Sequence, residues 1–147
     1  MKIIATNKKI HFNYFLIQEL EAGIKLAGNE IKSLRTNGAS FNDAFVEIED
    51  GEAFVYGLHI KPYEHNAAWS MTDPDRKRKL LLHKKEILIL KQKSAESGMT
   101  IVPVELYFTD GLVKITIALC KGKKLYDKRE TIKARDVKRS MEREGLS

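Results

Sequence analysis

The chain has 147 residues, a net charge of +6, 43% hydrophobic residues and one cysteine. These values fit one domain with a hydrophobic core and an appendage, and they exclude a framework of intramolecular disulfides or a zinc site built from several cysteines. Because no apolar run approaches the length of a membrane span and the N-terminus has no signal-peptide pattern, we expect a cytoplasmic protein.

The N-terminal part of the chain predicts a strand followed by a short helix. Residues 1–12 show no regular pattern. Residues 13–26 have the aromatic and β-branched composition of a strand, with a turn or bulge at 21–23. A helix is expected to begin at Gly28 and to end at Asn37-Gly38, because glycine favours helix termination.

Two hairpins are expected, each centred on an Asp-Gly pair, which is the strongest short signal for a hairpin turn. The first covers residues 44–58 around Asp50-Gly51, and the second covers residues 99–120 around Asp110-Gly111. Pro103 fits a sheet edge or a bulge. Several short strands and few helices predict a mainly β fold, a small closed antiparallel barrel with capping helices. This pattern alone does not distinguish an OB-type barrel from other small barrels.

A long loop and the longest predicted helix separate the two hairpins. The loop covers residues 62–75, a length that is common among functional or mobile loops, and we expect Trp69 to pack it onto the body. The helix covers residues 83–97 and should stop at Gly98. Its expected apolar face consists of Ile87, Leu88 and Leu90.

The positive charge is concentrated in two regions. Residues 76–93 contain eight basic residues and one acidic residue, and residues 121–147 contain ten basic and five acidic residues. The rest of the chain is acidic, with a net charge of −4 over residues 1–75 and −2 over residues 94–120. This partition suggests a polyanionic partner, although solvated charge is the alternative for each region. Tyr126, inside the second region, could stack on an unpaired base or anchor the end of a strand.

No enzymatic site stands out. The four histidines lack the spacing of metal ligands, and Gly122-Lys123 lacks the upstream glycine of a phosphate-binding loop. No serine lies in a nucleophile motif, and Cys120 lies in an apolar run that predicts burial. Glu47 and Glu49 are expected to be solvated rather than catalytic. We therefore expect no catalytic residue, metal or cofactor, and a general single-strand-binding barrel is a more reasonable alternative than a nuclease.

Four segments are specific enough to suggest a family. They are Glu21-Ala22-Gly23-Ile24, Glu30-Ile31-Lys32-Ser33-Leu34-Arg35, Arg78-Lys79-Leu80-Leu81-Leu82-His83-Lys84 and Lys121-Gly122-Lys123-Lys124-Leu125-Tyr126-Asp127-Lys128-Arg129. In this order, between Asn7 and Arg139, they closely resemble the small protein B family of bacterial SsrA (tmRNA)-binding proteins. The resemblance implies an OB-type six-stranded barrel over residues 1–120. It also implies a basic C-terminal tail over 121–147 that is disordered when free and helical on the ribosome.

The resemblance implies RNA binding rather than catalysis. The protein would bind the tRNA-like domain of tmRNA and deliver that RNA to stalled ribosomes for trans-translation, and we expect a monomer. The residues expected to bind tmRNA are Asn7, Lys8, Lys9, Glu21, Arg76, Arg78, Lys79, Leu81, Lys121, Lys123 and Lys124. The tail residues expected near the decoding centre and the empty mRNA channel are Tyr126, Asp127, Lys128, Arg129, Lys133, Arg135, Lys138 and Arg139.

Three of these positions match family contacts and make physical sense as such. A carboxylate beside phosphates is unfavourable, so the role of Glu21 is best explained by hydrogen bonds accepted from base donors. Leu81 offers an apolar surface to a base, and Asn7 can both donate and accept. The chain departs from the family pattern at Lys8, which replaces an arginine and lacks its planar fork, and at Asn13, which replaces an acid.

Overall fold

The structure is a computed structural model that describes residues 1–62 and 73–123. Trp69, expected to pack the long loop onto the body, lies outside the described residues, as does the chain from Lys124 onward. The described elements are β1 (Lys2–Thr6), α1 (Ile10–Asn13), β2 (Tyr14–Ile24), α2 (Gly28–Asn37), β3 (Ser40–Glu49), β4 (Glu52–His59), β5 (Arg78–Leu81), α3 (Lys84–Ser94), β6 (Met99–Thr109) and β7 (Leu112–Gly122).

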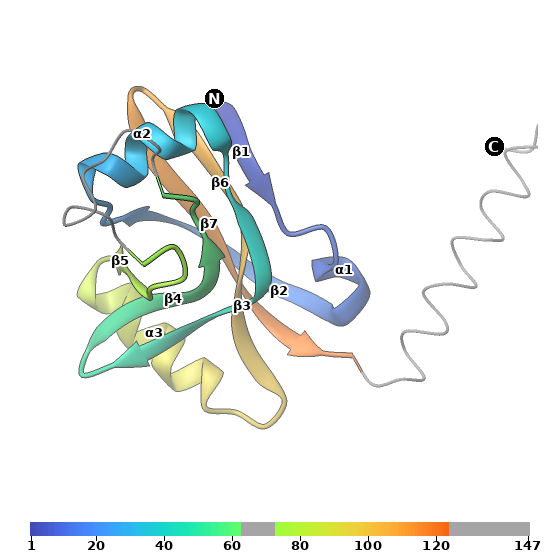
Figure 1. The fold of residues 1–147 in the computed structure, drawn as a ribbon. Helices are drawn as coiled ribbons and strands as arrows, with labels where there is room; N and C mark the ends of the chain where they lie inside the picture. The colour runs from blue at the N-terminus through green and yellow to red at the C-terminus, as the bar shows by residue number, and fades with distance from the viewer. Residues whose placement is uncertain (63–72, 124–147) are drawn as a thin grey trace, which may run out of the picture.

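The strands form a closed antiparallel barrel (Figure 1). The sheet order is β1-β6-β3-β4-β5-β2-β7, and β7 also pairs with β6, so that six strands close into a ring. β1 is a seventh strand, attached to the edge of β6 outside that ring. Closure leaves the ring without free edges, which are sites of unwanted pairing in open sheets. The predicted six-stranded barrel is therefore confirmed.

The two predicted hairpin turns are confirmed. Asp50 and Gly51 have φ angles of 49° and 76°, and Asp110 and Gly111 have φ angles of 49° and 77°. Left-handed backbone at both central residues is the conformation that matches the twist of the flanking strands, and Asp-Gly adopts it readily. The predicted bulge is also present, because the register of β6 against β7 shifts directly after Pro103.

The N-terminal residues differ from the prediction of an irregular segment. β1 pairs with β6, and α1 is a single turn whose Ile10 packs against Val102, Ala118 and Cys120. Both elements are too short to show a period of their own, and they form because of contacts with residues about 100 positions later. β2 also differs, since it is continuous to Ile24 and its register shift lies between Leu16 and Gln18 rather than at 21–23.

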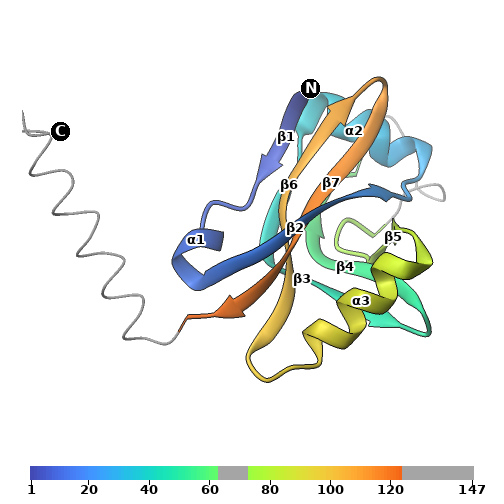
Figure 2. The same cartoon turned by 180° about the vertical axis from the view of Figure 1, so that it is seen from behind.

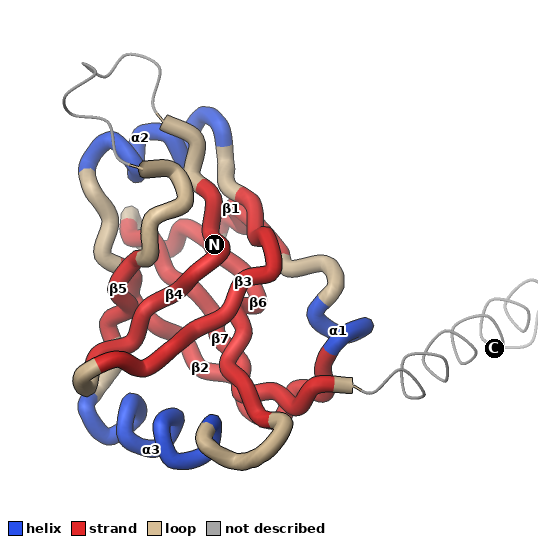
Figure 3. The backbone as a smooth tube through the Cα atoms, turned by 60° about the horizontal axis from the view of Figure 1, so that its bottom comes forward, coloured by secondary structure: helices blue, strands red, loops and turns tan. Residues whose placement is uncertain are grey.

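The core fills the barrel, and helices lie at its two ends (Figure 3). Its fully buried members include Val55, Leu58, Leu80, Leu106, Ile115 and Ile117. The helix α2 has the predicted bounds, whereas α3 is shorter than predicted. Only Leu90 of α3 is buried in the core, and Leu88 is 56% exposed, so the predicted apolar face was partly wrong.

A buried ion-pair cluster joins α2 to the two ends of the loop between β4 and β5. Arg78, with no exposed side-chain surface, donates from Nε to Glu30 at 2.7 Å and from its Nη atoms to the carbonyl oxygens of Leu58 at 2.6 Å and Pro74 at 3.1 Å. The other carboxylate oxygen of Glu30 accepts from Arg76 at 2.5 Å. The backbone of Ala27 donates to that same oxygen at 2.9 Å.

Two further contacts hold the ends of this loop together. The backbone N–H of Ile60 donates to the Pro74 carbonyl at 3.0 Å, and His59 pairs with Asp75 at 2.8 Å. His59 therefore has a structural partner. Together with Arg78, these contacts form a clasp across the base of the loop.

The Glu30 carboxylate is ionised in the folded protein. Burial alone would raise its pKa, but hydrogen bonds from Arg76, from the backbone of Ala27 and from Arg78 outweigh burial and hold the pKa below its usual value. A charged hydrogen-bonded pair of this kind is costly to break on one side, because the remaining charge stays buried without its partner.

We predict that Glu30→Gln lowers the free energy of unfolding by about 3–5 kcal/mol, because it leaves the buried Arg78 charge uncompensated. Urea unfolding at neutral pH measures the change. The matched control is Glu52→Gln, which breaks the exposed pair with Lys79 and should cost about 0–1 kcal/mol. Equal losses in the two variants would contradict the assignment of Glu30 as a structural residue.

The stability difference between wild type and Glu30→Gln should depend on pH. A carboxylate whose folded pKa is depressed stabilises the fold above its unfolded pKa, and this stabilisation is lost as pH falls through the folded value. The stability gap between wild type and Glu30→Gln should therefore narrow below the usual carboxylate pKa of 4.5. Urea unfolding at a series of pH values between neutral and acid tests this. A gap that stays constant would show that Glu30 does not titrate with folding.

Candidate nucleic-acid interface

Two predicted RNA-binding residues, Glu21 and Leu81, lie on the same side of the barrel wall. Glu21 on β2 is opposite Thr116 on β7, and Leu81 on β5 is opposite Gly23 on β2. Directly opposed residues point to the same side of a sheet, and the residue between them, Ala22, points into the core. We call the resulting surface the outer face, and the strands that carry it, β2, β5, β6 and β7, are labelled in Figure 2. It consists of Glu21, Gly23, Leu81, Glu105, Tyr107, Lys114 and Thr116.

The carboxylate of Glu21 is exposed but fixed in place. The Tyr107 hydroxyl, on β6, donates a hydrogen bond to Glu21 Oε2 across the intervening strand β7. Burial and this hydrogen bond raise the pKa of Tyr107, so the phenol keeps its proton and remains a donor. Within the described residues no other hydrogen bond to Glu21 is present. The carboxylate therefore retains acceptor capacity for a ligand that presents N–H groups.

Leu81 is held at the surface by its packing over a glycine. Its side chain is 53% exposed, and a Cβ added at Gly23 would lie 3.1 Å from Leu81 Cβ. Any larger residue at position 23 would push Leu81 away from the strand. An exposed leucine beside a fixed carboxylate offers apolar contact and hydrogen-bond acceptance together, which suits the face and edge of a nucleobase.

Glu21 and Leu81 line a groove of about 550 Å³ between β2, β5 and the start of α3. Lysines at its borders provide positive charge for phosphates. They are Lys79, Lys84 and Lys114. Lys79 pairs with Glu52 at 3.1 Å in the same groove. The structure thus brings three of the predicted residues together, namely Glu21, Lys79 and Leu81.

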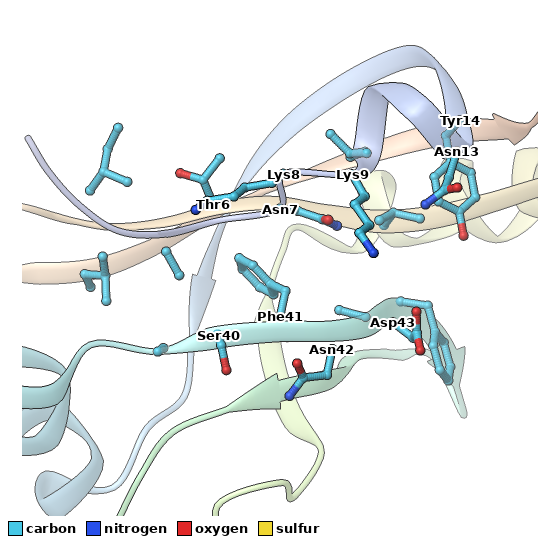
Figure 4. A pocket seen from close by; sticks show the side chains of 18 residues that line it. Thr6, Asn7, Lys8, Lys9, Asn13, Tyr14, Ser40, Phe41, Asn42 and Asp43 are labelled. Atoms are coloured by element: carbon cyan, nitrogen blue, oxygen red, sulfur yellow. The ribbon is translucent and has the colours of Figure 1, made fainter. Parts of the chain in front are cut away.

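Asn7 borders the outer face but lines a different groove. Its side-chain amide donates to the Pro103 carbonyl at 2.9 Å, and its backbone N–H donates to Val104 at 2.8 Å, so it attaches the β1–α1 corner to the bulge of β6. With Lys8 and Lys9 it lines a groove of about 850 Å³ between this corner and the start of β3 (Figure 4). Since both β6 and β7 lie between this corner and β2, the corner is about three strand spacings, roughly 14 Å, from the Glu21 strand.

Residues 76–78, the first three of the basic stretch, are not an open surface for RNA. Arg78 was predicted to bind RNA, but its side chain is fully buried and bonds Glu30, so this prediction was wrong. Arg76 also pairs with Glu30, and Lys77 pairs with Glu49 at 2.8 Å. Most of the positive charge of this run is therefore compensated by ion pairs within the fold.

The end of β7 keeps its basic residues at the surface. Lys121 is exposed. Lys123 donates to the carbonyl of His11 at 2.8 Å, and its backbone N–H donates to Asn13 at 2.9 Å. The fixed part of the chain thus extends past the expected barrel boundary at residue 120. The remaining predicted residues, Lys124 and all those from Tyr126 to Arg139, lie outside the described residues.

The described residues hold no group of acids, histidines or cysteines arranged to bind a metal ion. Cys120 is buried, and burial raises the pKa of its thiol to about 11, which suits a packing residue. No helix in the described parts of the chain has both the length and the hydropathy to cross a membrane.

Comparisons with known proteins identify the family of this chain. A family model described as SmpB protein matches residues 4–146. The chain belongs to the SmpB family. A relative from Thermosipho melanesiensis, named SsrA-binding protein, is 53% identical over 140 residues, which are 95% of each chain. A relative of the same name from Treponema denticola is 51% identical over 144 residues, 98% of this chain and 93% of the relative.

A solved structure of an SmpB relative supports the same membership. It is described as "tmRNA-SmpB: a journey to the center of the bacterial ribosome" and is 41% identical to this chain. The two superpose with a TM-score of 0.67 over 82% of this chain and 84% of the other. The family resemblance expected from the sequence is therefore confirmed, and the names of the SmpB relatives describe a binding protein rather than an enzyme.

Some residues of the outer face could not be found from the sequence. Tyr107, Lys114 and Thr116 join it only because β6 and β7 pair with β2 in this register. The alternating pattern of a strand predicts which of its side chains are exposed and which are buried. It contains no information on which residue of another strand will stand opposite.

Proposed function

We propose that this chain binds the tRNA-like domain of tmRNA and acts with that RNA on stalled ribosomes in trans-translation, in the bacterial cytoplasm. The incomplete peptide then receives a tag and the ribosome is released. The observation that carries the proposal is the presence of Glu21 and Leu81 side by side on the outer face of an SmpB-family barrel. The relatives are named for binding SsrA, and the solved relative is described with tmRNA and the bacterial ribosome.

The outer face suits RNA recognition because some of its side chains can contact a base and others can contact phosphates. Glu21 accepts hydrogen bonds from base N–H donors, which a carboxylate can do only where it is kept away from phosphates. Leu81 supplies an apolar contact to the same nucleotide. Lys79, Lys84 and Lys114, around the groove, contribute the salt-dependent attraction to phosphates. Specificity then comes from Glu21 and Leu81, and affinity comes largely from the lysines.

In this proposal the barrel and the C-terminal tail bind different partners. The barrel, with Asn7, Lys8 and Lys9 at its border, holds tmRNA. The basic tail, which carries ten Lys/Arg residues in 121–147, meets the ribosome. Within the tail, the segment Tyr126-Asp127-Lys128-Arg129 acts near the decoding centre, and the distal basic residues follow the empty mRNA channel. We expect the protein to act as a monomer.

We predict that Glu21→Gln weakens binding to the isolated tRNA-like domain of tmRNA by about 5- to 100-fold, the range for loss of one specific base contact. Glutamine keeps the shape and can still accept from Tyr107, so the fold should be unchanged. Equilibrium binding at several salt concentrations measures the effect, and the slope of affinity against salt should stay the same, because Glu21 contacts no phosphate.

The matched control is Glu19→Gln, an exposed acid two residues earlier on the same strand. It removes the same charge without touching the groove, so it should bind like wild type. If Glu19→Gln and Glu21→Gln behave alike, the effect is general electrostatics. If wild type itself fails to prefer tmRNA over a random RNA of equal length, the chain is a general single-strand-binding barrel.

Truncation tests the role of the tail. A chain ending after Lys123 keeps every described contact of that residue with α1 and β2. We predict that it binds the tRNA-like domain within about 3-fold of wild type, since few phosphate contacts are lost. We also predict that it no longer supports peptide tagging in a reconstituted translation system. Tagging at the wild-type level would remove the tail from the proposed mechanism.

A further inference from the structure

The hairpin of β3 and β4 presents an acidic surface away from Glu21. Residues 36–60 contain five acidic residues and no lysine or arginine. In the strand order, β5 separates this hairpin from β2, and β6 separates it from β7. Because Val46 and Val55 are buried in the core, the alternate residues of both strands point outward. We call these outward residues the hairpin face. It consists of Phe45, Glu47 and Glu49 on β3 and of Glu52, Phe54 and Tyr56 on β4.

Two stacked aromatic rings lie on the hairpin face. Phe45 is directly opposite Tyr56, and their ring centroids are 5.0 Å apart with an angle of 9° between the ring planes. The Tyr56 hydroxyl donates to Glu49, which holds the tyrosine in place, and Phe45 remains 37% exposed. The face of an aromatic ring attracts a cation, and a planar guanidinium also stacks on it. The exposed part of Phe45 is therefore suited to an arginine side chain.

One carboxylate of the hairpin face is left without a partner by the fold. Glu49 pairs with Lys77 at 2.8 Å, and Glu52 also has a lysine partner, at 3.1 Å. Glu47 is exposed and forms no ion pair or hydrogen bond with the described residues. It lies two positions after Phe45 on the same side of β3, a separation of roughly 7 Å. A guanidinium placed on the Phe45 ring can therefore also reach the Glu47 carboxylate.

The groove beside β3 extends this acidic surface. Phe45 and Asp43 both line the groove of about 850 Å³ between β3 and the β1–α1 corner, and Figure 4 shows Asp43 on its β3 wall. The other wall carries Lys8 and Lys9. A groove of this volume holds several residues of a peptide. Residues that flank an arginine on Phe45 can thus lie along the β3 wall.

The charge of this surface favours a basic protein over a nucleic acid. Three acidic residues of the hairpin and its turn, Asp43, Glu47 and Asp50, form no ion pair in the part of the chain that the structure describes, so phosphates would be repelled. An arginine uses a ring and a carboxylate together, and both arginine and aromatic residues are enriched where proteins bind one another.

We propose that the hairpin face is a docking surface for a partner protein, which places an arginine side chain against the Phe45 ring and the Glu47 carboxylate. This contact is separate from RNA binding, because the residues proposed to recognise tmRNA lie on β2 and β5 and this site lies on β3 and β4. The partner can therefore bind while tmRNA occupies the outer face.

The test uses a Gly-Ser peptide that contains two arginines as the probe. The same peptide with citrulline keeps the shape without the charge, and the same peptide with lysine keeps the charge without the planar group. Binding to the full-length protein is followed by the NMR signals of the Phe45 and Tyr56 rings at physiological ionic strength. The variants are Glu47→Gln and Phe45→Leu. Glu19→Gln is the matched control, because Glu19 is an exposed acid of β2.

We expect the arginine peptide to bind wild type saturably and to shift the signals of both rings. The citrulline peptide should bind at least about 5-fold more weakly, and the lysine peptide about 2-fold more weakly. Glu47→Gln and Phe45→Leu should each weaken binding of the arginine peptide by about 3-fold, whereas Glu19→Gln should bind it like wild type. The affinity of Glu47→Gln for the isolated tRNA-like domain should remain within about 2-fold of wild type.

Each other outcome overturns the proposal. Equal binding of the arginine and citrulline peptides, or no saturable binding, would show that the face does not recognise arginine. Equal losses in Glu47→Gln and Glu19→Gln would reduce the effect to general electrostatics. A lower affinity of Glu47→Gln for the tRNA-like domain would assign the face to tmRNA. A wild-type dimer in sedimentation that dissociates in Glu47→Gln would assign it to a second copy of this chain.

Discussion

The pairing of β7 on both of its sides is the interaction on which the rest of this structure depends. β7 pairs with β2 and with β6 along nearly its whole length, and it thereby closes the ring of strands. Its register decides which side chains of three strands face outward. The Tyr107–Glu21 hydrogen bond spans β7, and the opposition of Lys121 to Phe15 is a direct pair of the same ladder. A shift of one residue would turn each of these groups to the other side of the wall.

Local signals in the sequence predicted the features that local chemistry decides. The Asp-Gly pairs specified both hairpin turns, Pro103 specified a bulge, and Gly28 and Gly38 bounded α2. The family resemblance supplied Asn7, Glu21 and Leu81, which no pattern of composition or spacing had singled out. β1 and α1 escaped prediction because their stability comes from β6 and β7, more than 90 residues away in the chain.

The two basic regions show why charge along a sequence does not predict charge on a surface. Arg76, Lys77 and Arg78 belong to one run of cations, and each pairs with a glutamate brought near by folding. Glu30 and Glu49 are distant in sequence, so the run gave no sign that its charge would be compensated. At the end of β7 the strand ladder exposes Lys121 instead. The same residue type thus serves structure in one region and is available for binding in the other.

The clasp formed by Arg78, Ile60 and His59 fixes the two points where the chain leaves the barrel wall after β4 and rejoins it before β5. Since Arg78 also bonds Glu30 of α2, these two anchor points and the helix at one end of the barrel depend on the same buried ion pair. Loss of that pair would therefore loosen the helix and both anchor points together, because the remaining charge would stay buried without its partner.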